Sequence, residues 1–203
     1  MSRRSASFGE GYDPTVVDRL GVWLSARQIR RFVPSFAQKR VADFGCGYHA
    51  SFARTLAGEA ASVLVADVSL SPELSLDSRV RAAVGPLPDT LAALPAASLD
   101  VVLCISVLEH LWEPLDALTH FHRLLAPGGV CLVNVPSWAG KRYLELSAFR
   151  LGLSPAAEMN DHKAYYDVKD LWPLLVRAGF LPQNIDCFSH KLGLNTFAVC
   201  VKR

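Results

Sequence analysis

The sequence has no long hydrophobic run and almost no net charge, and each shortage excludes a class of protein. No stretch approaches the roughly 20 apolar residues that a membrane-spanning helix needs. The basic start MSRRSAS is not followed by the apolar segment of a signal peptide. The net charge of +2 is too small to predict binding to nucleic acid or adsorption to a membrane. We therefore expect a cytoplasmic protein with no membrane span and no nucleic-acid partner.

Cysteine is also scarce, and its spacing excludes the common cysteine-based sites. The five cysteines show no CxxC pair, which argues against a zinc site or a redox pair. Four of them lie in apolar, strand-like runs, where a thiol packs as a small hydrophobic group. We expect no metal site and five buried free thiols, which are Cys46, Cys104, Cys131, Cys187 and Cys200.

What is present is the pattern of an α/β domain. The 203 residues are 51% hydrophobic and 20% charged, which suits one globular domain. Strand-like runs that are apolar at nearly every position alternate with helical runs, which is typical of a parallel sheet covered on both faces. The last two strands are joined by a link too short for a crossover, so they are antiparallel. The prediction is a doubly wound, seven-stranded, mostly parallel sheet, with strands at 41–44, 62–67, 80–84, 99–106, 130–135, 181–189 and 195–202 and helices at 50–58, 88–94, 114–126 and 167–178.

Two regions lie outside this alternation. Residues 1–40 are expected to form an N-terminal helical cap segment, flexible over 1–11 and helical between 13 and 36. Residues 41–203 form the rest of the single domain, and the pattern is lost between about 137 and 166. We expect that stretch to be an insertion over the cleft rather than a framework element. Three tryptophans are expected in the core or at an interface, namely Trp23, Trp112 and Trp172.

The run VADFGCGYHA, residues 41–50, is the most informative stretch of the chain. A short apolar strand ends in Asp43, and Gly45 and Gly47 follow before a helix begins near Ser51. Glycines between a parallel strand and a helix let a ligand approach the backbone closely, and the free N–H groups of the helix face it. A carboxylate at the strand tip repels a pyrophosphate and attracts a cationic group. The turn therefore predicts a site for a positively charged ligand.

Three further features follow in order at the carboxyl ends of predicted strands, where open α/β sheets bind ligands. Asp67 ends the run VLVAD, and a carboxylate there can accept hydrogen bonds from both hydroxyls of a ribose. The third strand ends at the segment Ala83–Leu87, and the fourth at Ser106-Val107-Leu108-Glu109-His110.

This series resembles the class I S-adenosylmethionine-dependent methyltransferases, in particular the type 11 and type 23 groups with a vLEHl segment, a helix and a PGG turn. The resemblance is close from Arg40 to Ser137 and looser beyond it. The chain departs from the family at His49, where a third glycine is common, and after strand three, where Pro86 and Leu87 replace an acidic residue. The resemblance implies S-adenosyl-L-methionine as cofactor, held by Asp43, Gly45, Cys46, Gly47, Asp67, Val68, Leu87, Ser106 and Val107.

The acceptor side is predicted from fewer signals. A sulfonium already activates the methyl group, so the protein mainly has to orient an acceptor, and a base helps when the acceptor is a hydroxyl. His162 and His110 are the candidate catalytic bases, because histidine titrates near neutrality. The candidate substrate contacts are Trp138, Tyr165 and Tyr166.

The predicted function is methyl transfer to a small-molecule or glycan-type acceptor at oxygen. The segments HKLGLNT and DHKAYYDVKDL look like those of methyltransferases of cell-surface polysaccharide pathways, which implies a sugar or sugar-lipid substrate. Two alternatives stay open. The first is an NAD(P)-dependent oxidoreductase, because the turn also fits the dinucleotide pattern GxGxxA, although Asp43 argues against this ligand. The second is a protein of the same fold that binds S-adenosylmethionine without catalysing a reaction. The oligomeric state stays open as well.

Overall fold

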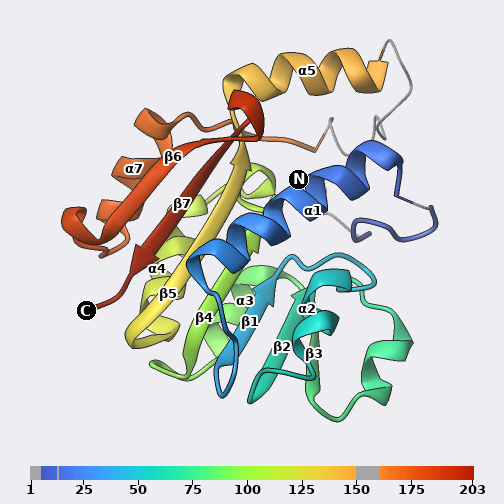
Figure 1. The fold of residues 1–203 in the computed structure, drawn as a ribbon, viewed down its shortest axis with the longest axis vertical. Helices are drawn as coiled ribbons and strands as arrows, with labels where there is room; N and C mark the ends of the chain where they lie inside the picture. The colour runs from blue at the N-terminus through green and yellow to red at the C-terminus, as the bar shows by residue number, and fades with distance from the viewer. Residues whose placement is uncertain (1–5, 13, 150–160) are drawn as a thin grey trace.

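Seven strands form one sheet in the order β3-β2-β1-β4-β5-β7-β6 (Figure 1). The computed structural model describes residues 6–12, 14–149 and 161–203. The first five strands run parallel, and β7 lies antiparallel between β5 and β6. The predicted fold class is confirmed by the strands β1 (Arg40–Phe44), β2 (Ser62–Asp67), β3 (Val80–Val84), β4 (Leu99–Ile105), β5 (Leu125–Pro136), β6 (Ile185–His190) and β7 (Asn195–Val201).

Helices cover both faces of this sheet. The helices α1 (Val16–Phe32) and α2 (Ser51–Leu56) pack on one face, and α3 (Leu87–Ala93), α4 (Pro114–Leu124) and α7 (Val168–Arg177) pack on the other. The helix α5 (Trp138–Phe149) crosses the carboxyl edge beyond the tip of β5 (Figure 1). The described part of the chain also contains short 3-10 helices, namely η1 (Pro72–Leu76), η2 (Leu108–His110), η3 (Pro182–Asn184) and η4 (Lys191–Gly193).

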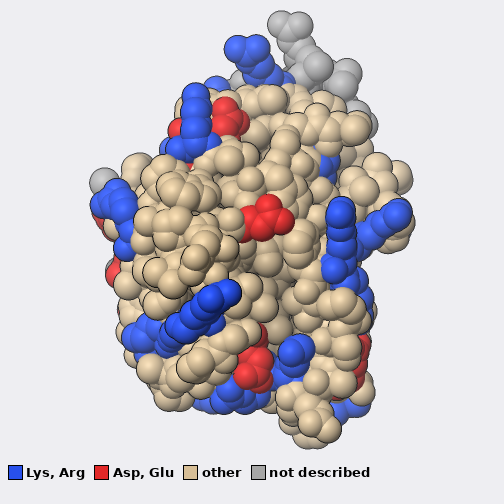
Figure 2. All heavy atoms as spheres, turned by 60° about the vertical axis from the view of Figure 1, so that its left-hand side comes forward, with Lys and Arg blue, Asp and Glu red and all other residues tan. Residues whose placement is uncertain are grey.

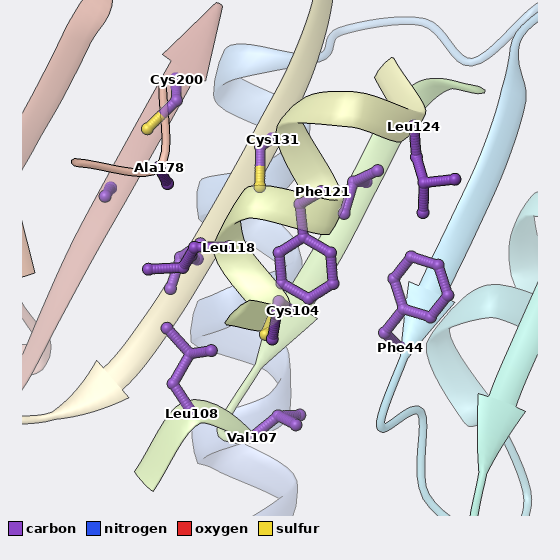
Figure 3. Close-up of a cluster of buried hydrophobic side chains, with 14 of the residues drawn as sticks. Phe44, Cys104, Val107, Leu108, Leu118, Phe121, Leu124, Cys131, Ala178 and Cys200 are labelled. Atoms are coloured by element: carbon purple, nitrogen blue, oxygen red, sulfur yellow. The ribbon is translucent and has the colours of Figure 1, made fainter. Parts of the chain in front are cut away.

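The core between the sheet and α4 is built from tightly packed apolar side chains and thiols (Figure 3). The rings of Phe44 on β1 and Phe121 on α4 stack with centroids 5.3 Å apart. Cys104, Cys131 and Cys200 are fully buried there, and burial raises the pKa of each thiol. All five cysteines are free, as predicted, although Cys46 and Cys187 are only half-buried.

The helix α7 was predicted correctly, because the local sequence determines where it begins and ends. The Asp167 carboxylate accepts the N–H of Asp170, and the Asp170 carboxylate accepts the N–H of Asp167 at 3.0 Å. This reciprocal capping satisfies two backbone donors that a helix start would otherwise leave unpaired. The chain then leaves the helix at Gly179, which has φ of +110°.

The expectation of a flexible lead-in over residues 1–11 is wrong for its described part. Residues 6–12 form a strap over the turn between β1 and α2. Ser7 is only 2% exposed, and the N–H of Tyr48 donates to the carbonyl of Phe8 at 2.8 Å. The sequence did not reveal this strap because its contacts are polar and long-range. Residues 1–5 lie outside the described residues.

The stretch 137–166, which shows no periodic pattern, begins with the regular helix α5. That this stretch is an insertion over the cleft stays a prediction. The backbone of Gly140 packs so closely on the β6–β7 turn that an added Cβ would lie 2.0 Å from the carbonyl oxygen of Leu194. A helix seated through a glycine needs no periodic apolar face, which explains the missing pattern. Strand β5 likewise begins at Leu125, before the predicted residue 130 and within the predicted helix. Residues 150–160 of the expected insertion lie outside the described residues.

The surface carries its charges in small groups. On the face shown in Figure 2, separate small groups of basic and acidic side chains interrupt a largely uncharged surface, and one acidic group lies near its centre. Within the described part of the chain, no helix has the length and apolar character to cross a bilayer. Trp23, Trp112 and Trp172 are 54%, 63% and 37% exposed, so they do not fill the core, and the alternative that they lie at an interface stays a prediction.

Candidate cofactor and acceptor site

The turn between β1 and α2 has a backbone that only glycine accommodates. Gly45 and Gly47 have φ of +74° and +75°, which disfavours other residues. A Cβ on Gly45 would lie 2.2 Å from the Cγ2 atom of Val107, which follows β4. A Cβ on Gly47 would lie 3.1 Å from the carbonyl oxygen of Phe8. The turn is thus held between the end of β4 and the N-terminal strap.

Asp43 lies directly under this turn and is a buried carboxyl group. It occupies β1 beside Val65 of β2 and Leu103 of β4, and it is 6% exposed. Burial, and secondarily the charge of Asp67, raise its pKa to about 7. A cation bound nearby would favour the ionised form of Asp43, so the group suits a positively charged ligand.

Asp67 ends β2 beside the same turn, as predicted, and both of its carboxylate oxygens accept hydrogen bonds. The N–H of Gly47 donates to Oδ2 at 2.8 Å, and the N–H of Val68 donates to Oδ1 at 2.8 Å. The hydroxyl of Ser7 donates to Oδ1 at 2.6 Å. An alcohol therefore already occupies one acceptor position of Asp67, which is the chemistry that a ribose hydroxyl would bring. Asp43 and Asp67 together fit S-adenosylmethionine.

The remaining predicted cofactor residues lie at the same edge of the sheet. Val68 follows β2 and Leu87 begins α3, and both are half-buried. Ser106 is exposed, has φ of +59°, and donates its N–H to the carbonyl of Asn134. Val107 is buried against Gly45. Burial raises the pKa of the Cys46 thiol, whose Sγ lies 3.4 Å from the carbonyl of Gly47, so Cys46 packs as a thiol.

The predicted bases His110 and His162 come together although they are far apart in the sequence. The N–H of Lys163 donates to the carbonyl of Glu109 at 2.6 Å, which seats residues 161–166 on η2. The two imidazole rings meet edge to face, with centroids 4.7 Å apart. His110 Nδ1 lies 2.9 Å from a carboxylate oxygen of Asp161, a partner that sequence reasoning did not assign.

The aromatic candidates divide into two groups. His162 Nδ1 lies 3.1 Å from the hydroxyl oxygen of Tyr165, whose ring is 5.6 Å from that of Trp138. Trp138 is 50% exposed at the edge. Tyr165 is 8% exposed and Tyr166 is 5% exposed, but Tyr166 belongs to the hydrophobic core under α4, where its hydroxyl donates to the carbonyl of Leu108 and burial raises its pKa to about 12. This position argues against the predicted substrate contact for Tyr166.

Among the described residues, Glu109, His110 and His162 also place one metal-ligand atom each within 4.8 Å of the others. Nitrogen and carboxylate ligands of this kind suit a divalent cation. His110 already pairs with Asp161, and no ion is needed to explain its position. The expected absence of a metal stays a prediction.

Two polar residues near this edge were missed. Asn134 on β5 is fully buried, and its side-chain amide has no hydrogen-bond partner in the structure. Lys191 in η4 is half-buried, and desolvation lowers its pKa to about 8, partly offset by the charge of Glu109. The asparagine interrupts the apolar run VCLVNVP, which is a signal that could have found it.

The comparison with known families decides the identity of the domain. The profile of a family described as a methyltransferase domain matches residues 23–182, which is more than half of the chain. The chain belongs to this family. The resemblance to class I S-adenosylmethionine-dependent methyltransferases is thereby confirmed.

Relatives of this methyltransferase domain agree with the assignment. A ubiquinone biosynthesis O-methyltransferase of Psychrobacter arcticus is 28% identical over 80% of the chain and 67% of its own length. The enzyme of the same name from Psychrobacter cryohalolentis is 31% identical over 60% of the chain and 50% of its own length. The chain thus spans between half and two thirds of these relatives. A crystal structure of a SAM-dependent methyltransferase from Archaeoglobus fulgidus has the same fold, with a TM-score of 0.65 and 15% identity over 89% of this chain and 94% of that one.

Proposed function

We propose that this methyltransferase domain transfers a methyl group from S-adenosylmethionine to an oxygen of a small-molecule or glycan-type acceptor. The observation that carries the cofactor is the pair of carboxyl groups under the glycine turn. Asp43 is buried with a pKa near 7 and Asp67 accepts a hydroxyl hydrogen bond, so the pair suits a ligand with both a positive charge and ribose hydroxyls.

The cofactor supplies an activated methyl group, and the protein supplies its surroundings. In our proposal the turn residues Gly45 and Gly47 carry the amino-acid part, and Asp67 holds the ribose. Val68 and Leu87 flank the adenine, while Ser106 and Val107 form the floor at the end of β4. These positions share one edge of the sheet.

Transfer to oxygen is supported by the histidines at this edge. A hydroxyl acceptor must lose its proton as the new carbon–oxygen bond forms, and a neutral imidazole accepts it. His162, beside the Tyr165 hydroxyl, is the base in our proposal, and the His110–Asp161 pair holds η2 and the segment 161–166 in register. The names of the Psychrobacter relatives also favour oxygen.

The proposal is tested first on the cofactor, with S-adenosylhomocysteine and NAD as matched ligands. We expect S-adenosylhomocysteine to raise the melting temperature and NAD to leave it unchanged, since only a true ligand stabilises the folded state. By calorimetry, Asp67→Ala should weaken S-adenosylhomocysteine binding sharply, with Asp89→Ala on the exposed side of α3 as control. Stabilisation by NAD alone would favour the oxidoreductase, and an unchanged affinity of Asp67→Ala would refute the placement of the ribose.

The acceptor is tested by transfer of labelled methyl groups to a panel of phenols, catechols and sugars, with amines for comparison. We expect a hydroxyl compound to be labelled. If the cofactor binds and no compound of any class is methylated, the non-catalytic alternative gains support. If an amine is labelled instead, the cofactor assignment stands and the preference for oxygen is wrong.

A further inference from the structure

The outer face of α1 carries apolar side chains that the fold leaves uncovered. Val16, Leu20 and Trp23 are 82%, 55% and 54% exposed, and their spacing of four and three residues places them on one face of the helix. The opposite face already supplies the buried side chains of α1, including Ile29. The outer stripe is therefore not required for packing, and a grouped set of exposed apolar side chains marks an interaction site.

A fourth exposed apolar side chain lies in the turn beside α1. Leu192 in η4 is fully exposed and has φ of +57°, a conformation that costs free energy for a side chain of this size. The same turn reaches α1, because Lys191 Nζ lies 3.7 Å from the position of a Cβ on Gly21. An apolar residue held at the tip of a strained turn contributes nothing to the core.

The charge around the stripe is basic. The helix α1 contains four arginines, of which Arg19, Arg27 and Arg31 are exposed, and the guanidinium carbon of Arg27 lies 5.7 Å from the ring centre of Trp23. Its acidic residue, Asp18, is used to cap the helix through Thr15. Arginine beside exposed tryptophan and leucine is the composition of surfaces that lie in the headgroup region of a bilayer.

The stripe also lies at the functional end of the molecule. The helix α1 follows directly on the strap, whose Ser7 hydroxyl donates to Asp67. Lys191, which touches α1, also lies within electrostatic reach of Glu109 in the candidate acceptor site. A surface that receives α1 would therefore lie close to the opening of the site.

We propose that Val16, Leu20, Trp23, Arg19, Arg27 and Leu192, here called the α1 surface, dock on a bilayer that contains anionic phospholipid. The apolar side chains insert among the headgroups, and the arginines pair with the lipid phosphates. The proposal that the protein docks on a bilayer is argued from this surface alone. That it presents a lipid-borne acceptor to the site rests on the proposed function.

The test is sedimentation of the full chain with vesicles of phosphatidylcholine, with and without phosphatidylglycerol. We expect binding to the anionic vesicles, weakened by salt because exposed charges are screened. Trp23→Ser and Leu192→Ser should each weaken binding by about tenfold, from the apolar area that stays in water. Arg19→Gln and Arg27→Gln should each weaken it roughly fivefold, as for single basic residues at such a surface.

Matched controls lie away from the α1 surface. Trp172 on α7 and Leu181 after it are exposed over the other face of the sheet, and Arg79 precedes β3 and pairs with Asp77. Trp172→Ser, Leu181→Ser and Arg79→Gln should leave vesicle binding unchanged. Melting curves by circular dichroism show whether each variant is folded. If Trp23→Ser or Leu192→Ser does not fold, the arginine variants and the salt series still test the docking.

Three results would overturn the proposal. They are no binding to either kind of vesicle, equal binding by the α1-surface and control variants, and a dimer in analytical ultracentrifugation that Trp23→Ser dissociates. The last would mean that a second copy of the chain covers the stripe. Binding of S-adenosylhomocysteine, measured without vesicles, separates failure of the docking proposal from failure of the proposed function. Trp23→Ser should leave the affinity for S-adenosylhomocysteine unchanged.

Discussion

The hydroxyl of Ser7 lies 2.6 Å from a carboxylate oxygen of Asp67, at the position where the proposed cofactor needs that carboxylate for its ribose. The Ser7 Oγ also lies 2.6 Å from the carbonyl oxygen of Ser69, so that its single proton is shared between two acceptors, and it accepts the N–H of Ser69 at 3.0 Å. The strap is thus held by the very group that the proposed cofactor uses. Binding and release of the cofactor should therefore be coupled to the strap.

Ser7→Ala tests this coupling. Removal of the hydroxyl frees Asp67, so we expect S-adenosylhomocysteine to bind more tightly by up to about tenfold, the range for a hydrogen bond to a charged group. Calorimetry measures the change, and the control is Ser98→Ala, at a half-buried serine whose hydroxyl donates to the carbonyl of Pro95. Weaker binding in Ser7→Ala would mean that the strap supports the pocket instead of competing for it.

The buried carboxyl group of Asp43 predicts that cofactor affinity depends on pH. Its pKa is raised to about 7, so it is largely protonated at pH 6 and ionised at pH 8. A cationic ligand prefers the ionised form, and S-adenosylmethionine should therefore bind more tightly as the pH rises through about 7. Calorimetry across that range should show this rise for the natural chain and a flat profile for Asp43→Asn. A fall in affinity with pH would place the positive charge elsewhere.

The same carboxyl group predicts the opposite trend for the ligand-free protein. Its pKa is raised on folding from 3.8, so the folded state holds the proton more tightly, and this contribution to stability is complete below 3.8 and lost as the pH rises to about 7. Relative to Asp43→Asn, the free energy of unfolding should fall by roughly 1.4 kcal/mol per pH unit in that window. Urea titrations measure the difference, and a constant difference would refute the raised pKa.

The sheet and the grouping of Asp43, Gly45 and Asp67 at one of its edges could be predicted because their signals are local. The three residues lie in or just after apolar strands, and parallel strands bring their carboxyl ends to one edge. The strap and the His110–Asp161 pair could not, since each joins polar groups that are distant in the sequence. Periodicity reports only apolar faces, so contacts of this kind leave no pattern.

The position of the helix α5 depends on a close contact at a single glycine, which periodicity also does not report. Replacing a helical glycine by alanine normally stabilises a helix by about 0.5–1 kcal/mol. Gly140→Ala should instead destabilise the protein by about 1–3 kcal/mol, because the new Cβ would lie 2.0 Å from the Leu194 carbonyl oxygen. Gly21→Ala in α1 meets Lys191 Nζ at an ordinary 3.7 Å and is the matched control. Equal thermal stability of the two variants would mean that α5 is not seated on the β6–β7 turn.

His162→Ala separates catalysis from binding at the acceptor side. The imidazole lies beside the Tyr165 hydroxyl and the His110 ring, which are both on the acceptor side of the candidate site. We expect turnover on a hydroxyl acceptor to fall by about a hundredfold or more, the usual contribution of a general base, with S-adenosylhomocysteine affinity nearly unchanged. The remaining activity should rise with pH as the acceptor ionises unaided. His110→Ala is the comparison, since loss of its Asp161 contact should lower the melting temperature as well. Equal losses of turnover and cofactor affinity in His162→Ala would make His162 a support of the pocket rather than its base.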